Sequence, residues 1–133
     1  MTIGKEDRAR FDELLDQVLA ELPPQLTKLF DEIPLVAEDE PSGKMLGELG
    51  LRSGRHLQGV HSGIPLTRRS VEHSGVLPTV ITIYRRGILN ASRDEAGRLS
   101  DETLRREIRV TILHELGHHF GMDEDDLRRH GYD

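Results

Sequence analysis

The chain has 133 residues, a length that fits one domain with a buried core, and we expect residues 1–133 to form a single domain. Charged residues make up 32% of the sequence, and the net charge of −6 disfavours binding to nucleic acid or to an anionic membrane surface. Because the sequence contains no cysteine, disulfides and thiolate ligands are excluded, and a bound metal must be held by histidine and carboxylate side chains.

The first part of the chain is predicted to hold one long helix and one strand. Charged residues open it without the apolar stretch of a signal peptide, so we expect a cytoplasmic protein. Apolar residues at helical spacing predict an amphipathic helix over residues 5–22, which Pro23 ends. Residues 33–37 are predicted to form a buried strand. Residues 42–56 contain four glycines and little periodicity, which indicates a surface loop.

Two further strands are predicted in the middle of the chain. Residues 57–63 are polar at alternate positions and interrupted by glycine, as an edge strand would be, and a loop is expected over residues 66–76. Residues 80–84 are β-branched or aromatic and carry the strongest strand signal in the sequence. We therefore expect residues 80–84 to form an inner strand, starting after Pro78.

Helices are predicted for the last third of the chain. Ser100 is a suitable N-cap, and acidic residues follow it where the helix dipole favours negative charge. The helical pattern then continues to Phe120, and Gly121 ends it. A last short helix is expected over residues 124–130.

The second half of this helix contains the sequence His-Glu-Leu-Gly-His, residues 114–118. At about 100° per residue, His114 and His118 lie one turn apart on one face, so both imidazoles can reach one ion. Glu115 lies on the adjacent flank, where its carboxylate can reach a water in an open coordination position and take its proton. This pattern predicts a hydrolytic zinc site with Glu115 as general base.

A catalytic zinc usually has three protein ligands, so the sequence must supply a third. Gly121 allows the chain to turn back toward the site, because glycine enters left-handed backbone conformations without penalty. Glu124 follows it by three residues, where the long zincin signature His-Glu-x-x-His-x-x-Gly-x-x-His has its third histidine. We predict Glu124 as the third ligand, with Asp123 as the alternative, since a capping role would compete with coordination by Asp123.

Simpler interpretations exist for these residues and for others. The two histidines could merely pack and cap the helix near its negative end. We expect His119, on the flank, to have a structural role beside the site rather than to be a ligand. Tyr132 could stabilise an oxyanion, although a C-terminal anchor is the simpler interpretation. Surface positions are expected for three other histidines and for the paired arginines: His56, His61, His73, Arg68, Arg69, Arg85 and Arg86. His61 would line the site if its strand borders it.

The sequence resembles the small bacterial zincin-like metallopeptidase family. The resemblance extends over much of the chain and includes Phe11 through Pro23, residues 36–41, 63–70, 75–78 and 81–84, and, most specifically, His114 through Leu127. It implies a minimal α+β zincin-like fold, in which a small mixed sheet packs on an N-terminal helix and a C-terminal metal-binding helix. It also implies Zn²⁺ held by two histidines and an acidic residue after the glycine turn.

Two functions from different classes are compatible with these features. The first is a zinc-dependent metallopeptidase that hydrolyses peptide bonds, acting on a peptide or an unstructured protein segment paired with the strand at residues 57–63. The second is a non-catalytic metal-binding or regulatory module that keeps the zincin fold. Glu115 favours the first, because a module without turnover does not need a carboxylate at that position.

Overall fold

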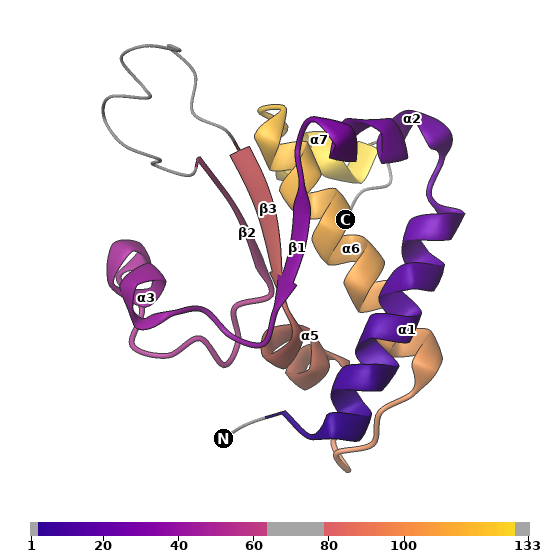
Figure 1. Cartoon of the computed structure of the whole chain (residues 1–133), viewed down its shortest axis with the longest axis vertical. Helices are drawn as coiled ribbons and strands as arrows, with labels where there is room; N and C mark the ends of the chain where they lie inside the picture. Colours follow the sequence, from indigo (N-terminus) through magenta and orange to yellow (C-terminus); the bar gives the residue numbers. More distant parts are fainter. Residues whose placement is uncertain (1–2, 64–78, 130–133) are drawn as a thin grey trace.

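The computed structural model of the chain describes residues 3–63 and 79–129 (Figure 1). Its helices surround a small mixed sheet, which confirms the predicted α+β class. In chain order, the elements are α1 (Lys5–Glu21), α2 (Pro24–Thr27), a 3-10 turn (Lys28–Asp31), β1 (Leu35–Glu38), α3 (Gly43–Leu49), β2 (Gly59–Gly63), β3 (Thr79–Tyr84), α5 (Arg85–Ser92), α6 (Asp101–His119) and α7 (Glu124–Arg129). None of the helices in the described ranges is long and apolar enough to cross a membrane.

The sheet has the strand order β1-β3-β2. β3 pairs in parallel with β1 and antiparallel with β2, which places it at the centre. The prediction of an inner strand over residues 80–84 is therefore confirmed. β2 is an edge strand of the described sheet, as predicted for residues 57–63, although pairing begins only at Gly59. The loop predicted over residues 66–76 and the strand-starting Pro78 lie outside the described residues.

β1 was predicted to be a buried strand, and this is wrong in part. It forms the other edge of the described sheet, and only alternate residues face the core. Leu35 and Ala37 pack against the core cluster, whereas Val36 is 40% exposed. The apolar run at 33–37 is therefore not one buried strand. Ile33 is buried before the strand begins, and Val36 lies on the outer face of the strand.

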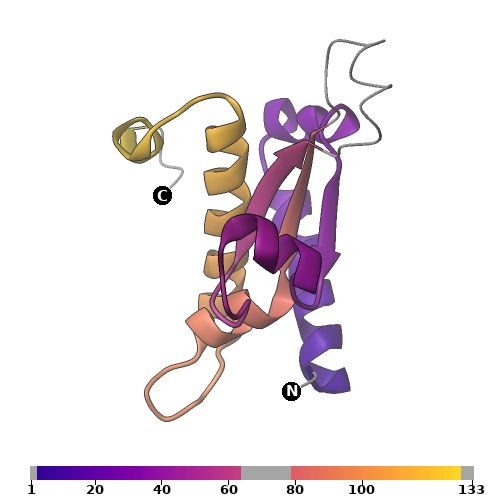
Figure 2. The same ribbon diagram turned by 90° about the vertical axis from the view of Figure 1, so that its left-hand side faces the viewer.

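Residues 42–56 are not wholly a loop as predicted, because they contain helix α3. The Ser42 hydroxyl caps this helix by accepting a hydrogen bond from the Met45 amide at 3.1 Å. Gly50 ends it in the left-handed conformation with φ of 70°. In Figures 1 and 2, α3 lies on the far side of the sheet from α1 and α6. The glycines that indicated a loop therefore include the terminator of a short helix.

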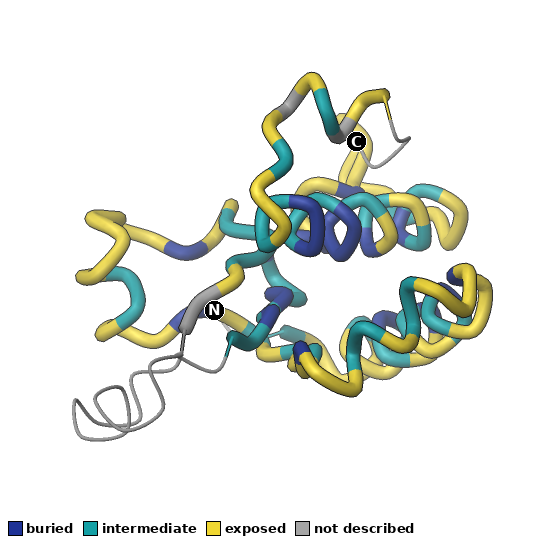
Figure 3. Tube along the Cα trace, turned by 90° about the horizontal axis from the view of Figure 1, so that it is seen from above, coloured by how far each residue is buried: buried dark blue, intermediate teal, exposed yellow. Residues whose placement is uncertain are grey.

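Helix α6 lies at the centre of the core. It begins after Ser100, whose hydroxyl accepts a hydrogen bond from the Thr103 amide at 3.1 Å, as predicted. It packs against α1, α5, β2 and β3. Buried and exposed residues alternate along the helical segments in Figure 3, as expected where only one face of a helix packs. The largest fully buried side chains among the described residues are Phe11, Val18, Ile81, Ile83, Tyr84, Ile88, Leu104, Ile108, Ile112, Leu113 and Leu116.

Two expectations about residues near the ends of α5 and α6 are corrected. The helix predicted to continue to Phe120 ends at His119, and the Phe120 side chain, which follows the last helical residue, is 55% exposed. Arg85, expected on a solvated surface, begins the unpredicted helix α5 and is only 15% exposed. Its guanidinium pairs with Asp12 at 2.8 Å and Asp39 at 3.1 Å. Arg85 therefore links α5 to α1 and to the segment after β1.

Candidate metal centre

The second half of α6 brings His114 and His118 together. Their spacing of four residues places one imidazole above the other, and the two Nε2 atoms lie 2.8 Å apart. The ring planes are nearly perpendicular, at 79°, with centroids 4.4 Å apart. Both side chains are partly buried, between the solvent and a helix face that is otherwise packed. The same nitrogen of each imidazole is thus directed to one point.

This arrangement fits a shared metal ion. With Zn–N distances of about 2.05 Å and a tetrahedral angle, two ligating nitrogens lie about 3.3 Å apart. The observed Nε2–Nε2 separation of 2.8 Å is about half an ångström shorter, a difference that small side-chain rotations can supply. Nε2 is also a common zinc-ligating atom of histidine. The donor set at this point is therefore suitable for zinc.

Glu115 lies on the adjacent flank of α6, facing the edge strand β2. Its side chain is 14% exposed, and its Oε2 lies 3.3 Å from Nδ1 of His61. The His61 ring also stacks against His118, with centroids 6.2 Å apart and an interplanar angle of 20°. His61 is exposed, as predicted, but its place beside the site was only the alternative expectation. The strand register determines this placement, and no local sequence signal predicts it.

Gly59 allows β2 to approach α6 closely enough for these contacts. A Cβ at this position would lie 3.0 Å from the Thr111 methyl, 3.2 Å from the Thr82 carbonyl oxygen and 3.3 Å from Cγ of Glu115. Because residues two apart on a strand share a face, Gly59 and His61 both meet α6, one turn of the helix apart. The glycine interruption that indicated an edge strand thus has a packing role.

A cavity of about 310 Å³ opens beside this site. It extends from Glu115 and His114 along α6 and along the residues that lead into β2. His56 is exposed, as predicted, and it also lines this cavity. The cavity is lined by His56, Leu57, Gln58, Gly59, Val110, Thr111, His114 and Glu115. Gln58 and Thr111 are joined across it by a hydrogen bond of 3.0 Å between Oε1 and the hydroxyl.

After α6 the chain turns at Gly121, which has a φ of 75°, as the sequence predicted. The Met122 amide donates to the Gly117 carbonyl at 3.0 Å, which closes the turn after the helix. Asp123 then caps α7, because its Oδ1 accepts a hydrogen bond from the Asp126 amide at 2.8 Å. The Asp123 amide, together with Arg129, holds the pKa of the Asp126 carboxyl below its usual value. Asp123, the alternative ligand, is therefore engaged in capping.

The backbone of Glu124 forms the first residue of α7, and its side chain lies outside what the structure describes. Among the described residues, no three histidine, aspartate or glutamate side chains gather closely enough to form a complete metal site. Glu124 as third ligand therefore stays a prediction. The expectations for His73 and Tyr132 also fall on residues outside the described ranges. His119 contacts the edge of the His61 ring, with centroids 6.4 Å apart.

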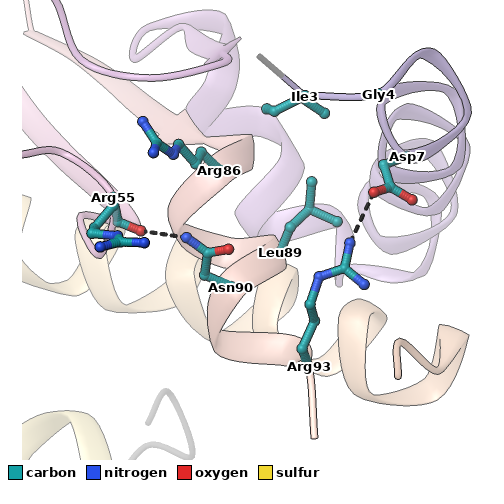
Figure 4. A pocket seen from close by; sticks show the side chains of 8 residues that line it. All are labelled: Ile3, Gly4, Asp7, Arg55, Arg86, Leu89, Asn90 and Arg93. Carbon is teal, nitrogen blue, oxygen red and sulfur yellow. Dashed lines mark hydrogen bonds and ion pairs between the residues drawn. The ribbon is translucent and has the colours of Figure 1, made fainter. Parts of the chain in front are cut away.

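A second hollow, of about 270 Å³, lies between α5 and the start of α1 (Figure 4). It is lined by Ile3, Gly4, Asp7, Arg55, Arg86, Leu89, Asn90 and Arg93. Figure 4 shows Arg93 directed to Asp7, which it meets at 2.8 Å. Arg86 pairs with Glu40 at 2.6 Å. Because these two arginines already have carboxylate partners, we assign the hollow no ligand.

The family comparison agrees with the geometry at α6. The model of the zincin-like metallopeptidase family matches residues 30–132, a stretch that contains the sheet, the helix α6 and the turn at Gly121. A search of curated proteins finds no match to the chain. The match extends over more than half of the chain and includes residues 114–118. The chain therefore belongs to the zincin-like metallopeptidase family.

Proposed function

We propose that the protein is a zinc-dependent peptidase whose ion is held by His114, His118 and Glu124, with Glu115 as general base. The observation that carries this proposal is the convergence of the two Nε2 atoms, 2.8 Å apart, beside a Glu115 carboxylate on the adjacent flank. The family match supports a hydrolase of this class. When bound, zinc would lower the pKa of a coordinated water and polarise the substrate carbonyl.

Glu115 would move the proton during the reaction. One oxygen of its carboxylate accepts a proton from water as the water oxygen forms a bond to the peptide carbonyl carbon. The same carboxyl group then donates that proton to the nitrogen of the breaking C–N bond, so that an amine leaves and Glu115 returns to its ionised form. The low exposure of Glu115, 14%, favours this role because fewer solvent molecules compete for the carboxylate.

The substrate would be an extended peptide or an unstructured protein segment. β2 is an edge strand of the described sheet and lies directly beside Glu115, so a peptide added to this edge would pass the site. The cavity beside Glu115 would receive one of its side chains. Within residues 3–63 and 79–129, little chain beyond the core surrounds α6, which favours a substrate segment that is not folded.

The metal content of the purified protein tests whether His114, His118 and Glu124 bind zinc. Elemental analysis of protein purified without added metal should give close to one zinc per chain in the wild type and in His119→Ala. Loss of zinc is expected in His118→Ala and in Glu124→Ala, because each removes one of three ligands. His119→Ala is the matched control, since it removes the neighbouring imidazole. Absence of zinc from the wild type even after reconstitution would refute the proposal.

A cleavage assay tests whether the protein hydrolyses peptides with Glu115 as base. It also distinguishes a peptidase from a non-catalytic metal-binding module. Zinc-loaded wild type is incubated with a library of unstructured peptides, and the products are identified by mass spectrometry. Glu115→Gln should keep its zinc and lose cleavage, because an amide cannot accept the proton from water. If Glu115→Gln cleaves as fast as the wild type, Glu115 is not the base. If the zinc-loaded wild type cleaves nothing, a metal-binding module becomes the better interpretation.

A further inference from the structure

The His61 side chain lies close enough to Glu115 to orient its carboxylate. It comes from β2, far away in the sequence, and its Nδ1 lies 3.3 Å from Oε2 of Glu115. Its cross-strand neighbour on β3 is Ile81, which is fully buried, so His61 projects from the face of the sheet that α6 covers. The strand is fixed against the helix there by the close approach at Gly59. His61 is thus held by the sheet and contacts the helix.

The chemistry of this contact decides which atom carries the proton. An ionised carboxylate can only accept hydrogen bonds, so Nδ1 of His61 is the donor. A glutamate side chain rotates broadly about its last torsion, and a donor at Oε2 restricts that rotation. Oε1 is then left for the proton of the attacking water.

We propose that His61 is a positioning residue, which holds the Glu115 carboxylate by an Nδ1–H···Oε2 hydrogen bond in the orientation required of a general base. This inference rests on the proposed function, because it assigns His61 a role in the same hydrolysis. His61 does not complete the metal site, because no three histidine, aspartate or glutamate side chains among the described residues lie close enough together to hold an ion. A neutral His61 that donates from Nδ1 has no proton on Nε2, so it is not an oxyanion donor.

Three substitutions at position 61 separate positioning from a merely structural role. His61→Asn places an amide N–H at about the position of Nδ1, whereas His61→Gln extends it to about the position of Nε2. Zinc content should match the wild type in all three. His61→Ala should lower kcat roughly 10- to 100-fold, as is typical when a hydrogen-bond partner that orients a residue of a metal site is removed, with KM changed less than about twofold. His61→Asn should recover most of the kcat, and His61→Gln should not.

Two kinetic results would overturn the proposal. An unchanged kcat in His61→Ala would show that Glu115 does not need the contact. Recovery by His61→Gln but not by His61→Asn would show that the working proton is on Nε2. Loss of zinc in His61→Ala would likewise overturn it, because the residue would then support the metal rather than the base.

An NMR measurement that needs no catalytic activity tests the role of His61 independently of the proposed function. In mildly alkaline buffer, the long-range ¹⁵N–¹H spectrum of the zinc-loaded protein reports which ring nitrogen of His61 carries the proton. We expect the Nδ1–H tautomer in the wild type and its loss in Glu115→Ala. An Nε2–H tautomer in the wild type refutes the contact, even if the enzyme cleaves peptides. An Nδ1–H tautomer in a protein without peptidase activity retains the contact and refutes only the proposed reaction.

Discussion

Gly87 in α5 is a position where the addition of one methyl group should displace the segment that leads into β2 and destabilise the fold. A Cβ there would lie 1.9 Å from the Leu57 carbonyl oxygen and 2.5 Å from its carbonyl carbon. Carbon atoms normally approach to about 3.5 Å, so the backbone at Leu57 would have to move by about 1 Å. That shift would strain the hydrogen bond of 2.8 Å from the Tyr84 amide to the Gln58 carbonyl.

The expected loss in the Gly87→Ala variant follows from three contributions. Overpacking typically costs about 1–3 kcal/mol, and a strained backbone hydrogen bond costs about 1 kcal/mol. Alanine favours the helix by about 1 kcal/mol over glycine, which partly offsets both. We therefore expect a loss of about 1–3 kcal/mol in the free energy of unfolding, which corresponds to about 4–12 °C in Tm for a chain of this size.

Urea unfolding followed by circular dichroism measures this difference, with Gly47→Ala as the matched control. Gly47 is also helical, in α3, but a Cβ there would have no neighbour within 4 Å. Gly47→Ala should therefore be neutral or more stable by up to about 1 kcal/mol. If Gly87→Ala is as stable as the wild type while Gly47→Ala behaves as expected, the close packing of α5 on Leu57 does not exist in solution.

Two further predictions concern Arg85 and Tyr84, which are adjacent where β3 ends and α5 begins. Arg85→Lys should lower the urea midpoint by an amount equivalent to about 1 kcal/mol, because one ammonium cannot replace the guanidinium that joins Asp12 and Asp39; an unchanged midpoint would contradict this. Burial, with the negative charge of Glu38, raises the pKa of the Tyr84 phenol above its usual value. The unfolded phenol then ionises first, so stability should fall as the pH rises from about 9 to about 11, and Tyr84→Phe should show a shallower fall in the same titration.

The sequence alone predicted the elements that are long or strongly patterned. α1 and α6 carry apolar residues at helical spacing over several turns, and each has a clear signal at its end. β3 is central in the described sheet, and its β-branched residues match that position. In these segments local propensity and tertiary packing favour the same conformation, so the local pattern is sufficient.

Short elements were missed because tertiary contacts rather than local patterns stabilise them. α5 begins at Arg85, directly after β3, and the β-branched run before it gives no sign that the chain changes to a helix. Gly87 lowers its helix propensity, yet this glycine is required for the packing on Leu57. In α3 the glycines similarly suggested a loop, although Gly50 ends a helix that Ser42 begins. A glycine therefore indicates either the absence of an element or a close contact of one, and the sequence does not distinguish them.

The candidate site likewise has a part that the sequence predicts and a part that depends on tertiary structure. The relation between His114, Glu115 and His118 follows from helix geometry alone, because all three lie within two turns of α6. The contact of His61 with Glu115 depends instead on the register of β2 and β3, and a shift of one residue would turn His61 to the opposite face. Local periodicity does not determine that register.

Gly59 links the stability of the fold to the geometry of the site. At this residue β2 lies close to α6, with a Cβ position 3.3 Å from Cγ of Glu115. A side chain there would push the strand away from the helix, and His61, two residues further along the same face, would move with it. Because a hydrogen bond weakens steeply beyond its normal length, even a displacement of a few tenths of an ångström would matter for a contact of 3.3 Å. The close packing of strand on helix is therefore what holds His61 within reach of the Glu115 carboxylate.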